Sequence, residues 1–388
     1  MEKIKLLWVG DFGVASGFSK ITESVLDRLP KDEYDISVFG INYSGEPHEH
    51  PYKVWPAKFR GDPLGTANLG RFVEQLKPDV LFLFNDLWTV INYKRSLEKL
   101  PNTFRVMTYF PVDADGYNDE WIASLKSFDR VIVYTQFAKK VLRDAGFRAE
   151  IIVIPHGINR SDFYPIDQVE ARETLSGLNR GDFIVFNANR NQMRKRIDLT
   201  IKGFCKFTRK KPETRLYLHM GMTDVGWDIL SLMRRECMSR GIDASTRLVI
   251  TNPEMSPTNA VSLEHMNIIY NTANVGINTS LGEGWGLCNF EQAACRVPQI
   301  VPDFSATKEL FEGRGLLLPI RQKLTALGIN TEGGLVHEDD VAAALETYYT
   351  SPDLMKQHAD AMFEYICQPQ FSWDAIAQEF DRQIKRTL

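Results

Sequence analysis

Short runs of apolar, β-branched and aromatic residues alternate with longer segments of helical periodicity along the chain. In the first half these runs occupy residues 4–9, 36–39, 80–84, 105–109, 131–134 and 151–154, and after a polar stretch they resume at 183–186, 215–218, 247–250, 275–278, 299–301 and 315–318. Buried apolar strands that alternate with helices are typical of parallel sheets covered on both faces. The pattern therefore predicts two doubly wound, Rossmann-like α/β domains.

Length and composition agree with a globular chain of two domains. At 388 residues the chain is longer than a single domain with one hydrophobic core usually is. A hydrophobic fraction of 44% and a charged fraction of 25% argue against disorder, and the net charge of −4 gives no overall attraction to nucleic acid or anionic lipid, although a local basic patch remains open.

Neither the cysteines nor the hydropathy indicate an exported protein. The five cysteines are odd in number, widely spaced, and lack metal-ligand spacing, so we expect free thiols in a reducing compartment. The apolar run at the start meets Asp11 too early for a signal sequence, and no run approaches the roughly 18 apolar residues of a spanning helix. We expect a cytoplasmic protein.

A glycine loop follows the first expected strand, in the sequence Gly10-Asp-Phe-Gly-Val-Ala-Ser-Gly-Phe-Ser. The apolar positions after it, at Phe18, Ile21 and Val25, indicate a helix. Ligands of open α/β sheets bind beyond the carboxyl ends of the strands, so Gly13 and Gly17 are candidate site residues.

A second glycine turn, Ser280-Leu-Gly-Glu-Gly-Trp-Gly-Leu-Cys-Asn-Phe-Glu, lies between a strand and a helix that opens near Leu287. Its glycines allow close approach of a ligand to the backbone, and the positive end of the helix suits an anion such as a diphosphate. Glu283 and Glu291 flank the expected phosphate position, one suited to sugar hydroxyls and the other to ribose hydroxyls. A purely structural turn with solvated glutamates is the alternative.

A basic segment, Asn187-Ala-Asn-Arg-Asn-Gln-Met-Arg-Lys-Arg, follows the strand at 183–186. Arg190 and Lys195 lie on the loop that opens the next helix, where they can neutralise a diphosphate without a metal ion. For Arg194 and Arg196 we expect a solvated helix face.

These segments resemble family 4 of the retaining glycosyltransferases, which have the fold called GT-B. The motif Glu-Gly-x-Gly-Leu with a second glutamate eight positions on is matched from Glu283 to Glu291, and an Arg, Lys and Asp in register are matched by Arg190, Lys195 and Asp198. Residues 298–319 and 154–159 are similar to further signatures of the family, so the resemblance covers nearly the whole chain. In style the chain also resembles glycosyltransferases of large viruses and phages, which would place it in a host cytoplasm.

The resemblance implies two facing Rossmann-like domains, a cleft between them, and a C-terminal helix that crosses back to the first domain. We accordingly expect an acceptor-side domain of residues 1–165 plus 371–388 and a donor-binding domain of residues 166–370. Glu283 would contact the transferred sugar, Arg190 and Lys195 the diphosphate, and Glu291 the ribose. The remaining donor-binding candidates are Gly13, Gly17, Gly284, Trp285, Gly286, Leu287 and Cys288.

One departure from the family lies after the strand at 105–109. Many members carry a histidine there, near the reacting carbon, whereas this chain reads Tyr109-Phe-Pro-Val-Asp-Ala-Asp115. Asp113 is the candidate occupant and the fourth candidate catalytic residue. Asp113 and Asp115 also match an Asp-x-Asp pattern that binds Mg²⁺ or Mn²⁺ in another glycosyltransferase fold. A three-residue match is common by chance, so we expect no metal and no cofactor beyond the nucleotide sugar.

The expected activity is transfer of a hexosyl or pentosyl group from a nucleoside diphosphate sugar to an acceptor hydroxyl, with retention of configuration. A nucleotide-sugar epimerase or hydrolase of the same fold and a non-catalytic binding module are the alternatives. The acceptor stays open among glycans, lipids, proteins, small molecules and a hydroxymethylated DNA base, as do the donor's base and sugar and the oligomeric state. His219 is expected to be structural.

Overall fold

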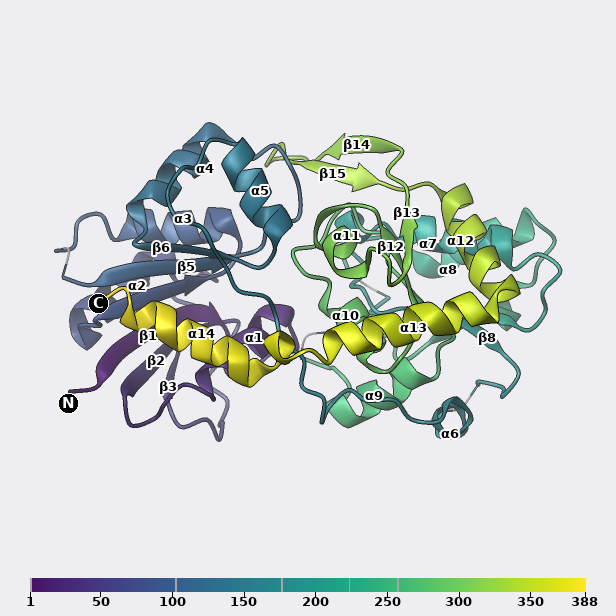
Figure 1. Cartoon of the computed structure of the whole chain (residues 1–388), viewed down its shortest axis with the longest axis horizontal. Coiled ribbons are helices and arrows are strands. Elements are labelled where there is room, and N and C mark those ends of the chain that lie inside the picture. Colours follow the sequence, from purple (N-terminus) through teal and green to yellow (C-terminus); the bar gives the residue numbers. More distant parts are fainter. Residues whose placement is uncertain (1, 102, 176, 223, 257) are drawn as a thin grey trace. The chain divides into compact units, whose positions relative to one another are not determined.

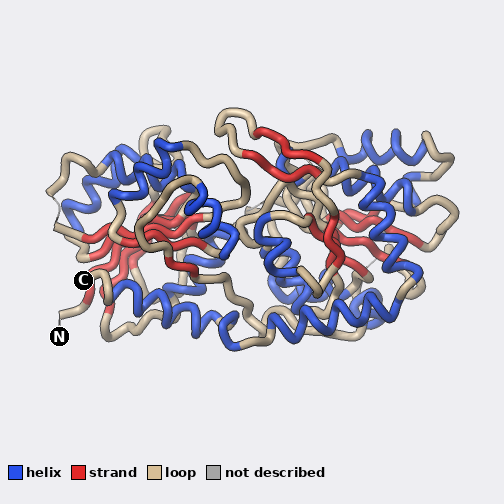
Figure 2. The backbone as a smooth tube through the Cα atoms, turned by 45° about the horizontal axis from the view of Figure 1, so that its top comes forward, coloured by secondary structure: helices blue, strands red, loops and turns tan. Residues whose placement is uncertain are grey.

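A computed structural model describes residues 2–101, 103–175, 177–222, 224–256 and 258–388, and the chain forms two compact units. Unit 1 consists of Met1–Val112, Gly116–Gly157 and Pro369–Leu388, and unit 2 consists of Asp113–Asp115 and Ile158–Gln368. Each unit has strands at its centre and helices packed around them (Figure 2).

Unit 1 is built on a parallel sheet of seven strands in the order β3-β2-β1-β4-β5-β6-β7. Figure 1 labels β1, β2, β3, β5 and β6 of this sheet. Its strands are β1 Ile4–Asp11, β2 Tyr34–Ile41, β3 Lys53–Pro56, β4 Val80–Phe84, β5 Arg105–Phe110, β6 Arg130–Val133 and β7 Ile152–Val153. All six strands expected from the first half of the sequence are present. The edge strand β3 was not expected, because its four residues are only partly buried or exposed and carry no apolar run.

The helices of unit 1 include one from the far end of the chain. They are α1 Gly17–Leu26, α2 Thr66–Leu76, α3 Leu87–Ser96, α4 Asp119–Ser124, α5 Gln136–Asp144 and α14 Trp373–Lys385, with short 3₁₀ turns at Leu125–Ser127 (η1) and Pro369–Phe371 (η4). Trp8 of β1 stacks on Phe82 of β4 with ring centroids 4.2 Å apart, and Phe380 of α14 meets the edge of Trp8 at 6.1 Å. This aromatic contact holds the C-terminal helix on the first sheet, as expected.

Unit 2 repeats the architecture with a parallel sheet of six strands in the order β10-β9-β8-β11-β12-β13. The strands are β8 Phe183–Asn187, β9 Thr214–Leu218, β10 Leu248–Ile250, β11 Val275–Ile277, β12 Gln299–Pro302 and β13 Leu316–Leu318. The helices are α6 Gln168–Glu173, α7 Ile197–Phe207, α8 Ile229–Met238, α9 Leu263–Asn271, α10 Leu287–Ala294, α11 Ser305–Phe311, α12 Glu338–Thr350 and α13 Pro352–Ile366, with 3₁₀ turns at Met193–Lys195 (η2) and Ala244–Thr246 (η3). The six expected strands of the second half are all found.

An antiparallel hairpin of β14 Gln322–Thr325 and β15 Glu332–Leu335 was not expected from the sequence. All four residues of β14 are exposed, so no alternation of apolar and polar residues marks the strand. Backbone bonds between Asp115 and Glu332, of 3.0 and 2.8 Å, join the segment Asp113–Asp115 to this hairpin.

The units divide at slightly different residues from those expected. Residues 158–165, which we assigned to the first domain, lie in unit 2. The backbone N–H of Tyr164 donates to Asn267 at 3.1 Å and that of Ile166 donates to Asn271 at 2.9 Å, so α9 holds the segment. The chain returns to unit 1 at Pro369, the first residue of η4, rather than at the expected residue 371.

Within the described part of the chain, no helix combines the length and the apolar character needed to cross a membrane. All five cysteines are free, as the sequence led us to expect.

Candidate functional site

The glycine turn after β11 leads into a helix whose first turn has no side-chain cap. Gly286 is the N-cap residue of α10 and has a φ of 89°, a left-handed conformation that favours glycine. Because the N-cap residue is a glycine, it provides no side-chain hydrogen bond to the start of this helix. Uncapped N–H groups at a helix start, together with the helix dipole, favour an anion.

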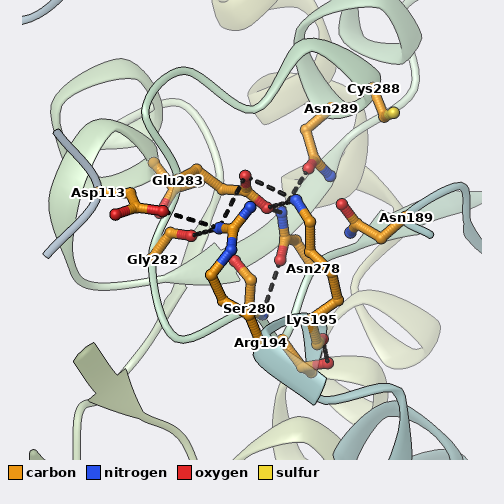
Figure 3. Close-up of polar contacts among 12 residues, drawn as sticks. Asp113, Asn189, Arg194, Lys195, Asn278, Ser280, Gly282, Glu283, Cys288 and Asn289 are labelled. Carbon is orange, nitrogen blue, oxygen red and sulfur yellow. Dashed lines mark hydrogen bonds and ion pairs between the residues drawn. The ribbon is translucent and has the colours of Figure 1, made fainter. Parts of the chain in front are cut away.

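Lys195 and Glu283 form a buried ion pair beside this turn (Figure 3). The Lys195 ammonium donates to both carboxylate oxygens of Glu283, at 2.6 and 2.8 Å. Burial disfavours a charged carboxylate, yet Lys195 and then Arg194 lower the pKa of Glu283 to about 2. Burial lowers the pKa of Lys195, and Glu283 opposes that shift. The two expected site residues are therefore brought into direct contact, with the charge of each stabilising the other.

Arg194 is part of the same cluster, although its side chain is 43% exposed, as expected of a solvated position. Its guanidinium lies 3.1 Å from a carboxylate oxygen of Asp113 and 3.6 Å from one of Glu283, and it donates to the carbonyl oxygen of Gly282 (Figure 3). The contacts with Asp113 and Glu283 were not foreseen, because they join the 3₁₀ turn η2 to segments distant in the sequence.

Asp113 is placed against the glycine turn by its backbone as well as by its side chain. A Cβ atom on Gly282 would lie 1.8 Å from the carbonyl oxygen of Asp113, so only glycine allows this approach. Asp113 thus reaches the Lys195–Glu283 pair through Arg194. Asp115 pairs with a different cation, Lys323.

Arg190, in contrast, does not touch Glu283 in this structure. Its guanidinium makes a two-point ion pair with Asp224, at 3.1 and 3.2 Å, and its side chain is 57% exposed. Arg196 also has its own partner, since it bonds to both oxygens of Asp198 at 2.9 and 2.8 Å. Arg190 and Lys195 therefore pair with different carboxylates in this structure, and their expected shared contact with a diphosphate stays a prediction.

Two polar residues that were not predicted as site residues support the pair. Asn278, at the end of β11, donates to Glu283 at 3.0 Å, and the hydroxyl of Ser305 accepts from the backbone N–H of Glu283 at 2.9 Å. Both residues are buried. In the sequence, Asn278 is a polar residue directly after β11, and Ser305 is the first residue of α11.

Of the other donor-binding candidates of α10 and its turn, Trp285 and Glu291 are buried, whereas Gly284, Leu287 and Cys288 are partly buried. Glu291 accepts from the Tyr270 hydroxyl at 3.0 Å. Burial, and then the charge of Glu291, raises the pKa of Cys288 to about 11. The Trp285 ring packs edge-on against Phe290 at 5.2 Å. Gly284 and Leu287 complete the turn into α10.

Gly13 and Gly17 belong to unit 1. Gly13 has a φ of 68° and its N–H donates to Glu23 at 3.1 Å, while Gly17 is the first residue of α1 behind the N-cap Ser16. The predicted loop between β1 and α1 is therefore present. Its contact with the donor phosphates stays a prediction.

His219 and the possible metal ligands are the remaining candidates for other chemistry. His219 bonds to Thr251 at 2.8 Å, and burial lowers its pKa to about 4, which suits a structural residue. Across the described ranges, no three His, Cys, Asp or Glu side chains are grouped so as to hold a metal ion.

Two family models match the chain. Residues 15–162 match the one described as Glycosyltransferase Family 4, and residues 262–380 match the one described as Family 4 Glycosyltransferase in conflict systems. A curated relative, mannosylfructose-phosphate synthase of Agrobacterium fabrum, is 26% identical over 208 residues, which is 50% of this chain and 44% of that protein. The matched part is thus less than half of the relative's length.

Solved structures show the fold. Sucrose-phosphate synthase from Thermosynechococcus elongatus matches with a TM-score of 0.77 and 18% identity, over 99% of each chain. Anabaena HepE in complex with UDP-glucose matches with a TM-score of 0.73 and 16% identity, over 99% of this chain and all of that one. Both likenesses show the GT-B fold. With the family matches, they support a family 4 glycosyltransferase.

Proposed function

We propose that this chain, which has the GT-B fold and matches family 4 glycosyltransferases in both halves, is a retaining glycosyltransferase. Its substrates would be a nucleoside diphosphate sugar and an acceptor that offers a hydroxyl group. The observation that carries the proposal is the buried Lys195–Glu283 pair beside the uncapped start of α10.

The positive charges of this site suit a leaving diphosphate. Lys195 and Arg194 converge on Glu283, and the N–H groups at the start of α10 follow directly along the chain. We propose that the diphosphate lies at these N–H groups with Lys195 against it, and that Glu283 faces the sugar hydroxyls. Preorganised cations and N–H groups stabilise charge that develops on a leaving group, and no metal ion is then required.

In the proposed reaction the bond between the anomeric carbon and the diphosphate oxygen breaks while the acceptor oxygen bonds to the same face of the sugar. The leaving diphosphate takes the proton of the acceptor hydroxyl. The products are the glycosylated acceptor and a nucleoside diphosphate. Asp113, held beside the site by Arg194, is the proposed residue near the reacting carbon.

UDP-glucose is the first donor to test, because the matched HepE structures hold UDP and UDP-glucose. The relatives' names include sugar-phosphate synthases, so sugar phosphates belong among the first acceptors beside glycans, lipids and hydroxymethylated DNA. The likeness to a family found in conflict systems keeps the DNA acceptor on that panel.

The test is a thermal-shift screen of nucleoside diphosphate sugars, followed by product analysis. A donor that binds only the folded protein raises the Tm by mass action. We expect at least one donor to do so, and its nucleoside diphosphate to be released with EDTA present when the correct acceptor is added. Anomeric coupling in the NMR spectrum of the product reports retention. If no nucleoside diphosphate sugar shifts the Tm, the proposal is wrong.

A further inference from the structure

Behind Glu283, four buried side-chain amides form one hydrogen-bonded chain. Asn278 donates to Asn289 at 2.9 Å, Asn289 donates to Gln299 at 2.8 Å, and Gln299 donates to Gln292 at 3.1 Å. Asn278 also donates to Glu283 at 3.0 Å, so the chain ends on that carboxylate (Figure 3). Each of the four amides is at least 96% buried.

The orientation of the amides in this chain follows from two backbone groups, one that bonds to Asn278 and one that bonds to Gln299. The N–H of Ser280 can only donate, and it donates to the Asn278 side chain at 2.8 Å, which fixes that atom as the oxygen. The carbonyl of Val297 can only accept, and Gln299 donates to it at 2.9 Å. The amide nitrogen of Asn278 must therefore face Glu283, where it favours an ionised, accepting carboxylate.

The surrounding backbone is adapted to this chain of amides. A Cβ atom on Gly276 of β11 would lie 2.0 Å from the side-chain oxygen of Gln292 and 2.3 Å from that of Gln299. Buried amides are costly unless they are hydrogen-bonded, and apolar side chains would fill this space without that cost. Burying these amides costs free energy of folding, and the chain of amides ends on the Glu283 carboxylate. This indicates that the amides act on Glu283.

Thr279, the residue after Asn278, holds the backbone turn that carries Lys195. The Thr279 hydroxyl donates to the backbone carbonyl of Arg196 at 2.8 Å, and it also meets the hydroxyl of Thr200 at 2.8 Å. Consecutive residues, Asn278 and Thr279, thus hold Glu283 and the turn that carries Lys195.

We propose that Asn278, supported by the buried amides of Asn289 and Gln299, is a positioning residue that holds the Glu283 carboxylate ionised and in place for the donor sugar. This inference rests on the proposed function, because Asn278 can affect catalysis only if Glu283 binds the donor sugar. Asn278 acts through Glu283 and does not itself meet the donor.

The charged groups that face Glu283 are Lys195 and Arg194 of η2, with Asp113 beyond Arg194 and the Cys288 thiol of α10 nearby. Asn278→Asp would add a carboxylate of nearly the same shape against Glu283. Two adjacent carboxylates raise each other's pKa, because both cannot ionise freely. We therefore expect the variant to lose about 10-fold in kcat at pH 7.5 and to regain most of it near pH 5.5, where one shared proton restores a donor to Glu283.

Asn271→Asp is the matched control. Asn271 is a buried asparagine of the same unit whose amide bonds to the backbone of Tyr164 and Asn267 and does not touch Glu283. Its substitution introduces the same buried charge. We expect a loss of stability in this control, with the pH profile of kcat unchanged from wild type.

Asn278→Ser is the substitute if Asn278→Asp does not fold. Because serine is too short to reach Glu283, we expect a pH-independent loss of kcat with little change in KM.

A second readout separates this inference from the proposed function. The ¹³C resonance of the Glu283 carboxyl, followed by NMR against pH, reports its pKa without any substrate. We expect the pKa of Glu283 to rise in both Asn278 variants and to stay near the wild-type value in Asn271→Asp. An unchanged Glu283 titration in the Asn278 variants overturns the inference, whether or not the wild type transfers sugar. If the wild type binds no donor, the proposed function is wrong. The Glu283 titration then still tests whether Asn278 holds that carboxylate ionised.

Discussion

The Lys195 ammonium lies 2.6 and 2.8 Å from the two carboxylate oxygens of Glu283. Glu283→Gln keeps the shape of the side chain and leaves the lysine charge buried without its partner. Removing one member of a buried pair costs about 3–5 kcal/mol. We expect that loss in urea unfolding, together with a fall in kcat of about 100-fold or more, since the contact to the sugar is also lost.

Glu312→Gln is the control for that variant, because Glu312 is exposed in the same unit. Its stability and turnover should equal those of the wild type. Normal turnover in Glu283→Gln would show that this carboxylate has no part in transfer.

Stability should depend on pH through the same carboxylate. The pKa of Glu283 in the folded protein, about 2, lies below its usual value of 4.5. The contribution of the ionised Glu283 carboxylate to the free energy of unfolding is therefore present above about pH 4.5 and is lost as the pH falls toward 2. The difference in unfolding free energy between wild type and Glu283→Gln, on the order of 3 kcal/mol, should shrink in this range. Urea melts at pH 6, 4 and 3 measure it, and a constant difference would contradict the pairing.

Asp224 restrains Arg190 in a two-point pair, and the pair competes with any contact between Arg190 and a diphosphate. Exposed pairs of this kind are worth about 1 kcal/mol or less. Asp224→Asn should therefore lower KM for the donor by up to about 5-fold. Arg190→Ala should raise KM for the donor. When Asp224→Asn is added to Arg190→Ala, KM should not change further. A double variant that still gains affinity from Asp224→Asn would remove Arg190 from the donor site.

Gly282 is where the carbonyl of Asp113 approaches most closely. Gly282→Ala would place a Cβ atom 1.8 Å from that oxygen, so the segment Asp113–Asp115 must move. We expect a loss of about 1–3 kcal/mol in stability and a larger loss in turnover. Gly181→Ala is the control, since a Cβ at that position meets nothing within 4 Å. Equal effects of the two substitutions on turnover would argue against a role for the Asp113 segment.

The sequence predicted the fold well because the strands are fully apolar runs between helices. β4 and the carboxyl-terminal half of β1 are completely buried, and their hydrophobicity alone marks them. The hairpin β14–β15 was missed because its register is held by backbone bonds and by Asp115, which no local pattern reveals.

The site was predicted in part. Glycines before a helix and a glutamate between them are visible locally, and the contact of Lys195 with Glu283 follows from neighbouring strands that end at one sheet edge. The involvement of Arg194, the diversion of Arg190 to Asp224 and the amide chain behind Asn278 depend on side chains from segments distant in sequence. Periodicity contains no information about such contacts.

The most direct test of the account is donor binding to Lys195→Met, measured by calorimetry with the nucleoside diphosphate sugar that stabilises the wild type. Methionine keeps the apolar stem and removes the charge that Lys195 would present to the diphosphate. Hydrogen bonds to charged groups contribute about 1.5–3 kcal/mol, so we predict at least about a 10-fold increase in Kd for the donor and for the free nucleoside diphosphate. A folded Lys195→Met protein that binds both as tightly as the wild type would contradict the assignment of the donor site.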